Sequence, residues 1–390
     1  MASNALLRQI AALETDPEFM AGMGALPNPD HVLSKASLSQ RIFREILSDP
    51  HVFAKVIDRR SGVFSQEWQV RAAGDEPQAG QAAELCQRAL DRMTHHPEWP
   101  LSGSLVQIQE AVFFGYRGLE VLWEATADGL LPACLRDIPG RRLVHDGREW
   151  RILTKDDAVT GITIPPRKAL IAAHMATSDN PYGEALLSRC YWPWMFKHSG
   201  LRWWVTMAEK YGLPWIIAKL GAAADETARR DMLDKLSAMV MDAVAVVPEG
   251  ADIELKNQSG ARSEVHESLI HLANAEISKV IVGQTLSTEV DGQGSYAAAR
   301  IHGALRDEIV DGDRKLVAHT MSRLCAWICE LHFGTAEYAP EFEFVDEAKP
   351  PLEWAQAVTT ASQVLGEALP ERWVFDRLGI GEEYREKKNA

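Results

Sequence analysis

The side chains that could carry out chemistry are few, and they stand apart from one another. Asp311 and Asp313 flank Gly312, and two carboxylates at this spacing could act as a pair, but the glycine favours a solvated bend in a helix. The sequence contains no GxxxxGK[ST] phosphate-binding loop and no HExxH, CxxC or GxSxG motif. No catalytic residue, cofactor or metal site is therefore predicted, and the chain is expected not to be an enzyme.

The histidines and cysteines support the same expectation. His266 and His271 are five residues apart, so they do not share one helix face and are poorly placed to bind one metal ion. Cys325 and Cys329 are four residues apart on a predicted helix, but no second Cys/His pair completes a zinc site. Buried packing is the predicted role of these two thiols. Three isolated histidines are interpreted as surface or hydrogen-bonded side chains: His174, His198 and His302.

Length, composition and charge argue against several classes of protein. A chain of 390 residues with 46% hydrophobic and 25% charged residues is typical of a folded protein with two or more substructures. No apolar run is long enough to span a membrane, no secretory leader is recognised, and the five scattered cysteines indicate reduced thiols. The formal net charge of −14 argues against a protein that grips DNA, because phosphate contacts need Lys and Arg.

The periodicity of apolar residues predicts an α+β fold, without the strand–helix alternation of a doubly wound sheet. Helices are predicted at 38–60, 78–93, 104–114, 225–241 and 263–282, and from near 295 to about 333. Strands are predicted at 68–70, 119–123, 214–219, 243–247, 253–255 and 341–345, and a β-rich segment with several turns is predicted at 131–166. Two short helices, 354–365 and 371–378, are predicted after a boundary at Pro350-Pro351.

A long helix is predicted in the middle of the chain, from Glu184 to Tyr211, with Gly212 and Pro214 ending it. Aromatic side chains surround most of it: Tyr191, Trp192, Trp194, Phe196, Trp203 and Trp204. Because a helix in a monomeric core needs only one apolar stripe, this distribution suggests neighbours on several sides, some in other subunits. On the helix pattern alone, however, the central helix of a large monomeric core is the preferred interpretation.

One long stretch and four shorter segments resemble the Mu-like phage portal proteins. The central signature of that family is similar to residues 180–215, NPYGEALLSRCYWPWMFKHSGLRWWVTMAEKYGLPW. Further segments fit in the same order: DPHVFAKVIDRRSGVFSQEWQV (49–70), EAVFFGYRGLEVLWE (110–124), EISKVIVGQTLSTEV (276–290) and GSYAAARIHGALRDEIVDGD (294–313). The resemblance covers most of the chain from about Leu38 onward. It departs at the C-terminus, where this chain is shorter than expected of the family.

The resemblance implies a portal fold and a map of its parts. These parts are an N-terminal arm (1–37), a wing (38–183 and 296–349), two stem helices (184–212 and 261–283), a clip (213–260), a tunnel loop (284–295) and a reduced crown with the C-terminal tail (350–390). It implies a homo-oligomer of twelve subunits at one capsid vertex of the virion, assembled in the host cytoplasm and away from membranes. Double-stranded DNA would pass through this ring without sequence specificity, during packaging and ejection. The implied protein partners are the terminase large subunit, the major capsid protein with its scaffold, and the head–tail connector or adaptor protein.

The resemblance also implies roles for three groups of residues. Subunit packing in the stem is expected of Trp192, Phe196, Trp203 and Trp204, and partner docking on the clip of Asp225, Glu226, Arg229 and Arg230. The DNA channel is expected to be lined by Thr288, Glu289, Asp291 and Gln293, although by itself this polar loop would be interpreted as an ordinary exposed connection. The alternative function is a genome-processing enzyme, such as a nuclease or terminase subunit, which would need clustered acidic metal ligands or a phosphate loop.

Overall fold

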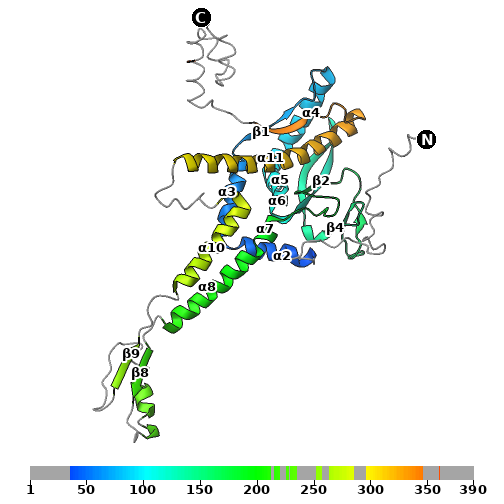
Figure 1. The fold of residues 1–390 in the computed structure, drawn as a ribbon. Coiled ribbons are helices and arrows are strands. Elements are labelled where there is room, and N and C mark those ends of the chain that lie inside the picture. The colour runs from blue at the N-terminus through cyan, green and yellow to red at the C-terminus, as the bar shows by residue number, and fades with distance from the viewer. Residues whose placement is uncertain are drawn as a thin grey trace, which may run out of the picture. The chain divides into compact units, whose positions relative to one another are not determined.

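The computed structural model describes residues 36–211, 215–219, 225–227, 229–234, 252–256, 263–284, 296–345 and 360, and the structural statements below concern these residues. The chain divides into two compact units, whose elements are labelled in Figure 1. The first unit comprises 1–42, 56–186 and 296–390, and the second comprises 43–55 and 187–295. Several predictions lie outside the described residues: the arm up to residue 35, the strand 243–247, the loop 285–295 and, apart from residue 360, the short helices after Pro350-Pro351.

The first unit is built on a three-stranded antiparallel sheet with the order β3-β2-β7. Its strands are β2 (Tyr116–Thr126), β3 (Gly129–Ile138) and β7 (Ala169–Ala173). The central strand β2 contains the predicted strand 119–123 and extends beyond it at both ends. Leu119 and Val121 are fully buried on the inner face, as their alternation in the sequence predicts.

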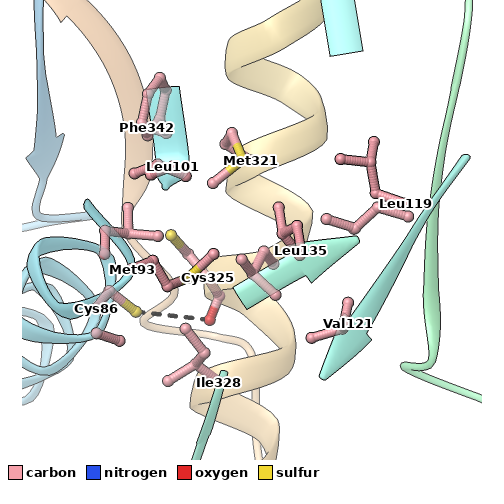
Figure 2. Close-up of a cluster of buried hydrophobic side chains, with 14 of the residues drawn as sticks. Cys86, Met93, Leu101, Leu119, Val121, Leu135, Met321, Cys325, Ile328 and Phe342 are labelled. Carbon is pink, nitrogen blue, oxygen red and sulfur yellow. Dashed lines mark hydrogen bonds between the residues drawn. The ribbon is translucent and has the colours of Figure 1, made fainter. Parts of the chain in front are cut away.

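Three helices pack with this sheet and complete the main core: α4 (Pro77–Thr94), α5 (Leu101–Gln109) and α11 (Tyr296–Phe333). The bounds of α4 and α11 confirm the predicted helices. Buried residues of α11 recur every three or four positions, which is the pattern of an amphipathic helix: Val317, Met321, Leu324, Cys325 and Ile328. Figure 2 shows Met321 and Cys325 on this helix, with Met93 and Leu135 beside them. No helix in the described part of the chain is long and apolar enough to cross a membrane.

The predicted start of the helix 104–114 is wrong. Helix α5 begins at Leu101 and ends at Gln109, and a separate short helix α6 (Ala111–Phe114) follows. Pro100 immediately precedes α5, where the lack of a backbone N–H costs nothing. The hydroxyl of Ser104 donates to the carbonyl of Leu135 at 3.3 Å, so this serine joins helix to sheet and caps no helix.

The cysteines belong to the interior of the protein. All five are free and buried, which confirms the packing role predicted for Cys325 and Cys329. The sulfur atoms of Cys86 and Cys329 lie 3.9 Å apart, and the Cys86 thiol donates to the Cys325 carbonyl at 3.7 Å. This hydrogen bond raises the pKa of Cys86, and burial raises the pKa of Cys190 to about 12. Cys86 and Cys190 are therefore protonated at neutral pH and are poor nucleophiles.

The strands predicted at 68–70 and 341–345 are confirmed and pair with each other. Strands β1 (Glu67–Arg71) and β10 (Glu341–Val345) run antiparallel, with Trp68 opposite Phe344 and Val70 opposite Phe342. The Trp68 ring stacks on the Phe342 ring, with 5.3 Å between the ring centroids. The alternate residues form an exposed polar face, where Arg71 makes ion pairs with Glu341 and Glu343.

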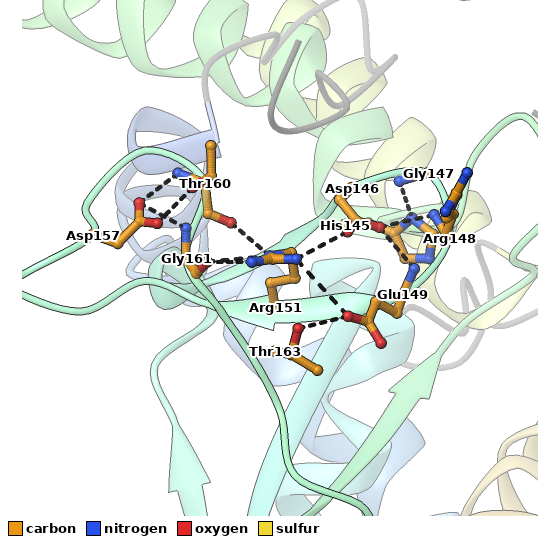
Figure 3. Close-up of polar contacts among 10 residues, drawn as sticks. All are labelled: His145, Asp146, Gly147, Arg148, Glu149, Arg151, Asp157, Thr160, Gly161 and Thr163. Atoms are coloured by element: carbon orange, nitrogen blue, oxygen red, sulfur yellow. Dashed lines mark hydrogen bonds and ion pairs between the residues drawn. The ribbon is translucent and has the colours of Figure 1, made fainter. Parts of the chain in front are cut away.

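The predicted β-rich segment 131–166 also carries a small antiparallel sheet, drawn in Figure 3. Its strands are β4 (Leu143–His145), β5 (Trp150–Ile152) and β6 (Ile162–Thr163), and the short helix η2 (Gly140–Arg142) precedes them. Aspartates organise both connecting turns. Asp146 accepts from the backbone N–H groups of Arg148 and Glu149 at 2.9 and 2.8 Å. Hydrogen bonds from the Thr160 hydroxyl and nearby backbone N–H groups lower the pKa of Asp157 to about 2.

The interpretation of Asp313 as part of a solvated helix bend is wrong. Helix α11 runs without interruption through Gly312, and the carboxylate of Asp313 is buried. Arg59 donates to its two oxygens at 2.7 and 2.8 Å, and Gln109 donates to one of them at 3.2 Å. Asp311 differs, because its side chain is 57% exposed and pairs with Arg314 on the surface. The two aspartates therefore do not form a carboxylate pair.

The second unit contains an antiparallel pair of long helices, α8 (Tyr191–Tyr211) and α10 (Ser263–Val282), visible side by side in Figure 1. The prediction for 263–282 is confirmed, but the continuous helix 184–211 is not. A short helix α7 (Leu186–Arg189) ends before Cys190, and α8 starts afresh. Pro193 explains the break, because it has no N–H to bond back to Arg189 and fits the first turn of a new helix.

Two strands complete the described part of this unit. Strands β8 (Trp215–Lys219) and β9 (Asp252–Lys256) lie where strands 214–219 and 253–255 are predicted, and they pair antiparallel with each other. Residues 226–227 and 229–234 are helical, in agreement with part of the predicted helix 225–241. The predicted hairpin would pair 253–255 with 243–247, and the pairing observed for β9 is with β8.

Candidate subunit interface on helices α8 and α10

Helix α8 exposes large aromatic side chains that a solitary protein would be expected to bury. Trp192 is 55% exposed, Phe196 54% and Trp203 67%. These residues lie on one side of the helix, because spacings of four and seven return to nearly the same direction. The fourth predicted residue, Trp204, is half-buried. Three of the four residues proposed from the sequence therefore form one exposed aromatic stripe.

Helix α10 carries an aliphatic stripe next to the aromatic one. Val265, Leu269 and Leu272 are exposed and stand four and three residues apart. Leu269 lies against Gly200 of α8, where an added Cβ would come within 3.2 Å of the leucine Cδ2. On α8, Gly200 lies between Phe196 and Trp203 along the helix. The two stripes consequently meet and form one apolar surface, which we call the open face.

Polar residues bind a third helix to this pair. The chain from Ala36 forms α2 (Ala36–Leu47) and α3 (Pro50–Val63), whereas one helix is predicted at 38–60. The break arises at Asp49-Pro50, because a residue before proline is driven out of the helical region. The Asp49 carboxylate accepts from the N–H groups of His51 and Val52 at 2.9 and 3.2 Å, and so caps α3.

The same carboxylate joins α3 to α8. Lys197 of α8 donates to Asp49 at 2.8 Å, and both side chains are about nine-tenths buried, with 9% and 10% exposed. One oxygen of Asp49 thus serves as helix cap and as ion-pair partner. Removing either charge would leave the other without compensation in a poorly solvated site.

His51 joins α3 to α10. Its Nε2 lies 3.0 Å from the carbonyl oxygen of Asn274 and 2.8 Å from the hydroxyl of Ser278. Because a carbonyl can only accept, the bond to Asn274 places the ring proton on Nε2. This nitrogen cannot then take a proton from Ser278, so the pair is not a nucleophilic dyad. Burial, followed by the charges of Lys197 and Lys55, lowers the pKa of His51.

Two further groups of site residues are predicted, one on the clip and one in the tunnel loop. Asp225, Glu226, Arg229 and Arg230 are all exposed, and Glu226 and Arg230 lie 3.8 Å apart as a surface pair one helical turn apart. Thr288, Glu289, Asp291 and Gln293 lie outside the described residues. Within the described part of the chain, no three His, Cys, Asp or Glu side chains are grouped closely enough to hold a metal ion.

Sequence reasoning missed the residues that assemble this site. Gly200 lies within the predicted helix 184–211 and Leu269 within the predicted helix 263–282, but nothing in the sequence indicates that they meet. Asp49 and Pro50 carried a readable signal, since a capping residue followed by proline is typical of a helix start. Lys197 and Ser278 carry no such signal in the sequence, because each contacts α3 only through tertiary packing.

The mixed helices and antiparallel sheets define an α+β fold, and the comparisons with known proteins agree. A chain in the neck of an empty gene transfer agent particle matches with a TM-score of 0.65 at 14% identity, covering 96% of this chain and 100% of that one. A chain in the virion of a native gene transfer agent particle matches with a TM-score of 0.62 at 13% identity, covering 96% and 99%. At these identities the likeness concerns the fold.

Sequence comparison gives the family. The family described as the portal protein of Mu bacteriophage matches residues 40–380, and the chain belongs to this family. The Mu-like prophage FluMu protein gp29 of Haemophilus influenzae is 24% identical over 346 residues, which cover 85% of this chain and 65% of that protein. The portal protein of Escherichia phage Mu is 24% identical over 280 residues, covering 70% and 53%. The chain thus spans between half and two thirds of the curated relatives it matches.

Proposed function

We propose that this protein is the subunit of a portal ring at one vertex of a phage capsid. Such a ring is the conduit through which double-stranded DNA is packaged and ejected, and the platform for the packaging motor and the tail. Family membership, the fold shared with chains of a particle neck and virion, and the surface of the second unit support this proposal. The ring would contain twelve subunits, assemble in the host cytoplasm and remain in the virion.

The single observation that carries the proposal is the open face of α8 and α10. Trp192, Phe196, Trp203 and Leu272 are each more than half exposed. Tryptophan is among the side chains that contribute most to the binding energy of protein interfaces. A monomer would leave this apolar surface in water, whereas a ring buries it between neighbouring copies.

The charge of the chain suits a conduit. A surface that neutralises phosphates would hold the duplex and would have to release it at every step of translocation. A formal net charge of −14 per chain, repeated around a ring, opposes such binding. In this proposal the loop 284–295 faces the channel, and Thr288, Glu289, Asp291 and Gln293 crowd the DNA without gripping it.

The residues between the two long helices would form the clip (213–260). We assign to it the docking of the terminase large subunit and, after packaging, of the head–tail connector or adaptor protein. Its exposed charges at Asp225, Glu226, Arg229 and Arg230 are candidates for that contact. The wing segments 38–183 and 296–349 and the crown 350–390 would contact the major capsid protein and its scaffold.

The experiment that tests the proposal is imaging of the purified chain by negative stain, together with light scattering. Rings with a central hole are expected. A purely monomeric chain would contradict the proposal. An enzymatic role is tested on the same sample, because the competing function, a nuclease or terminase subunit, would require DNA cleavage that depends on ATP or a metal ion. If the homogeneous protein cleaved DNA in this way, the proposal of a conduit would be wrong and the enzymatic function would take its place.

A further inference from the structure

Helix α3 has an outward surface without charge. Its five exposed residues are Pro50, Phe53, Ala54, Ile57 and Ser61, in a chain where 25% of residues are charged. Phe53 is 52% exposed, while its neighbours Val52 and Lys55 are buried. Depletion of charged residues around an exposed aromatic side chain is typical of the centre of a protein interface. Pro50, Phe53 and Ala54 belong to the second unit, with α8 and α10.

The first turns of α3 lie on the side of the helix pair opposite to the open face. On α10, His51 of α3 contacts Ser278, which is nine residues from Leu269. Nine residues at about 100° each amount to two and a half turns, so Ser278 and Leu269 point in opposite directions. The open face and the α3 contact therefore use opposite sides of α10.

Helix α8 gives the same result. Lys197, which bonds Asp49 at the start of α3, is five residues from Trp192 and six from Trp203. These spacings separate the lysine from the two tryptophans by roughly 120–140° around the helix. The second unit thus presents two different apolar surfaces on opposite sides: the open face, and behind it the outer side of α3 around Phe53.

We propose that the open face of one subunit packs on the α3 surface around Phe53 of the next subunit. The inference rests on the proposed function and names the two surfaces that make the ring. A head-to-tail contact uses two different surfaces on separate sides of the subunit. When repeated, it gives a ring if the rotation between neighbours closes and an open filament if it does not. A contact between two open faces would instead give a two-fold dimer, in which α3 stays exposed and no ring forms. The occupant of the α3 surface is therefore a second copy of this chain.

Cysteine cross-linking tests the pairing directly, because all five native cysteines are buried and a short bismaleimide should react with introduced thiols. The variants are Phe53→Cys and Phe196→Cys, separately, mixed and combined in one chain. The head-to-tail pairing predicts no cross-link in either single variant and covalent dimers in the mixture. The combined variant should give a ladder of larger oligomers. Arg202→Cys, exposed on α8 away from the open face, is the control and should not link to Phe53→Cys.

The outcomes separate this inference from the proposed function. Rings without a link between positions 53 and 196 would overturn the pairing and leave the portal ring standing. Efficient linking of Phe196→Cys alone would show that open faces meet each other, and would overturn it as well. A monomeric wild-type chain would overturn both. If Phe196→Cys itself weakens assembly, Leu272→Cys places the thiol on the same face from α10, with the same expected ladder.

Discussion

Replacing Asp313 by Asn tests whether the buried ion pair with Arg59 holds the first unit together. The substitution preserves the shape of the side chain and removes its charge. Arg59 would remain with its side chain only 8% exposed, and it would lose the charged carboxylate that accepts two of its hydrogen bonds. Breaking a buried pair by removing one partner costs about 3–5 kcal/mol, chiefly because the other charge is left uncompensated.

The chain offers a matched control two residues away on the same helix. Asp311→Asn removes the same charge from α11, but its carboxylate is 57% exposed and its partner Arg314 also donates to the carbonyl of Gly62 at 2.6 Å. Exposed ion pairs contribute between zero and about 1 kcal/mol. The two variants should therefore differ by at least about 2 kcal/mol in the unfolding free energy of the first unit.

The assay must report on that unit, because a chain with two compact units need not unfold in one step. Amide hydrogen exchange in α11 meets this need, since the protection of core amides approaches the local unfolding free energy. Loss of protection should be large in Asp313→Asn and small in Asp311→Asn. Equal protection in the two variants would refute the reasoning, because burial of the pair would then have no energetic consequence. Replacing Arg59 and Asp313 together by apolar residues should recover most of the loss.

Three further predictions concern assembly, pH and the channel. Trp203→Ala removes a side chain that is 67% exposed, so the unfolding free energy of the free chain should change by less than about 1 kcal/mol. Light scattering should show that this variant no longer forms rings, and intact rings would contradict the prediction. The pKa of His51 is lowered in the folded chain, so the unfolded chain binds the proton more readily and stability should fall as the pH drops below 6.5. In His51→Asn this contribution is removed. The midpoints of urea unfolding at pH 7.5 and pH 5.5 should therefore lie closer together than in the wild type. Changing Glu289 and Asp291 together to Lys should leave the rings intact, but the rings should bind DNA with a steep salt dependence and package it more slowly. Unaltered DNA affinity and packaging would place this loop away from the DNA.

Elements with strong local signals were predictable from the sequence. The helices 263–282 and 296–333 have long apolar periodicity with glycines near their ends, and their bounds agree with the structure. The strands at 68–70 and 341–345 were recognisable from alternation, but their pairing was not, because nothing local connects residues so far apart. The break at Cys190 is not part of the predicted helix 184–211, although Pro193, which fits the first turn of a new helix, is a local signal for it.

The candidate site was predictable in type and not in detail. The aromatic residues on α8 suggested neighbours on several sides, but their pattern alone favoured a monomeric core, and the family resemblance was needed to assign them to subunit packing. The continuity of the open face depends on Leu269 lying against Gly200, and that contact arises only when two helices meet. Asp313 was misinterpreted for the same reason, because its partner Arg59 is separated from it by 254 positions.

The pairing of β1 with β10 has a consequence for the newly made chain on the ribosome. Gln69 and Glu343, which face each other across these strands, are separated by 274 positions. At about 5–20 residues per second, synthesis of that interval takes roughly 14–55 s, and β1 has no strand partner until it is complete. Charged and polar residues at alternate positions of β1, namely Glu67, Gln69 and Arg71, would hinder the waiting strand from pairing with the wrong chain. The residues 187–295 emerge within that interval, so the second unit can fold while the first is still waiting for its last strand.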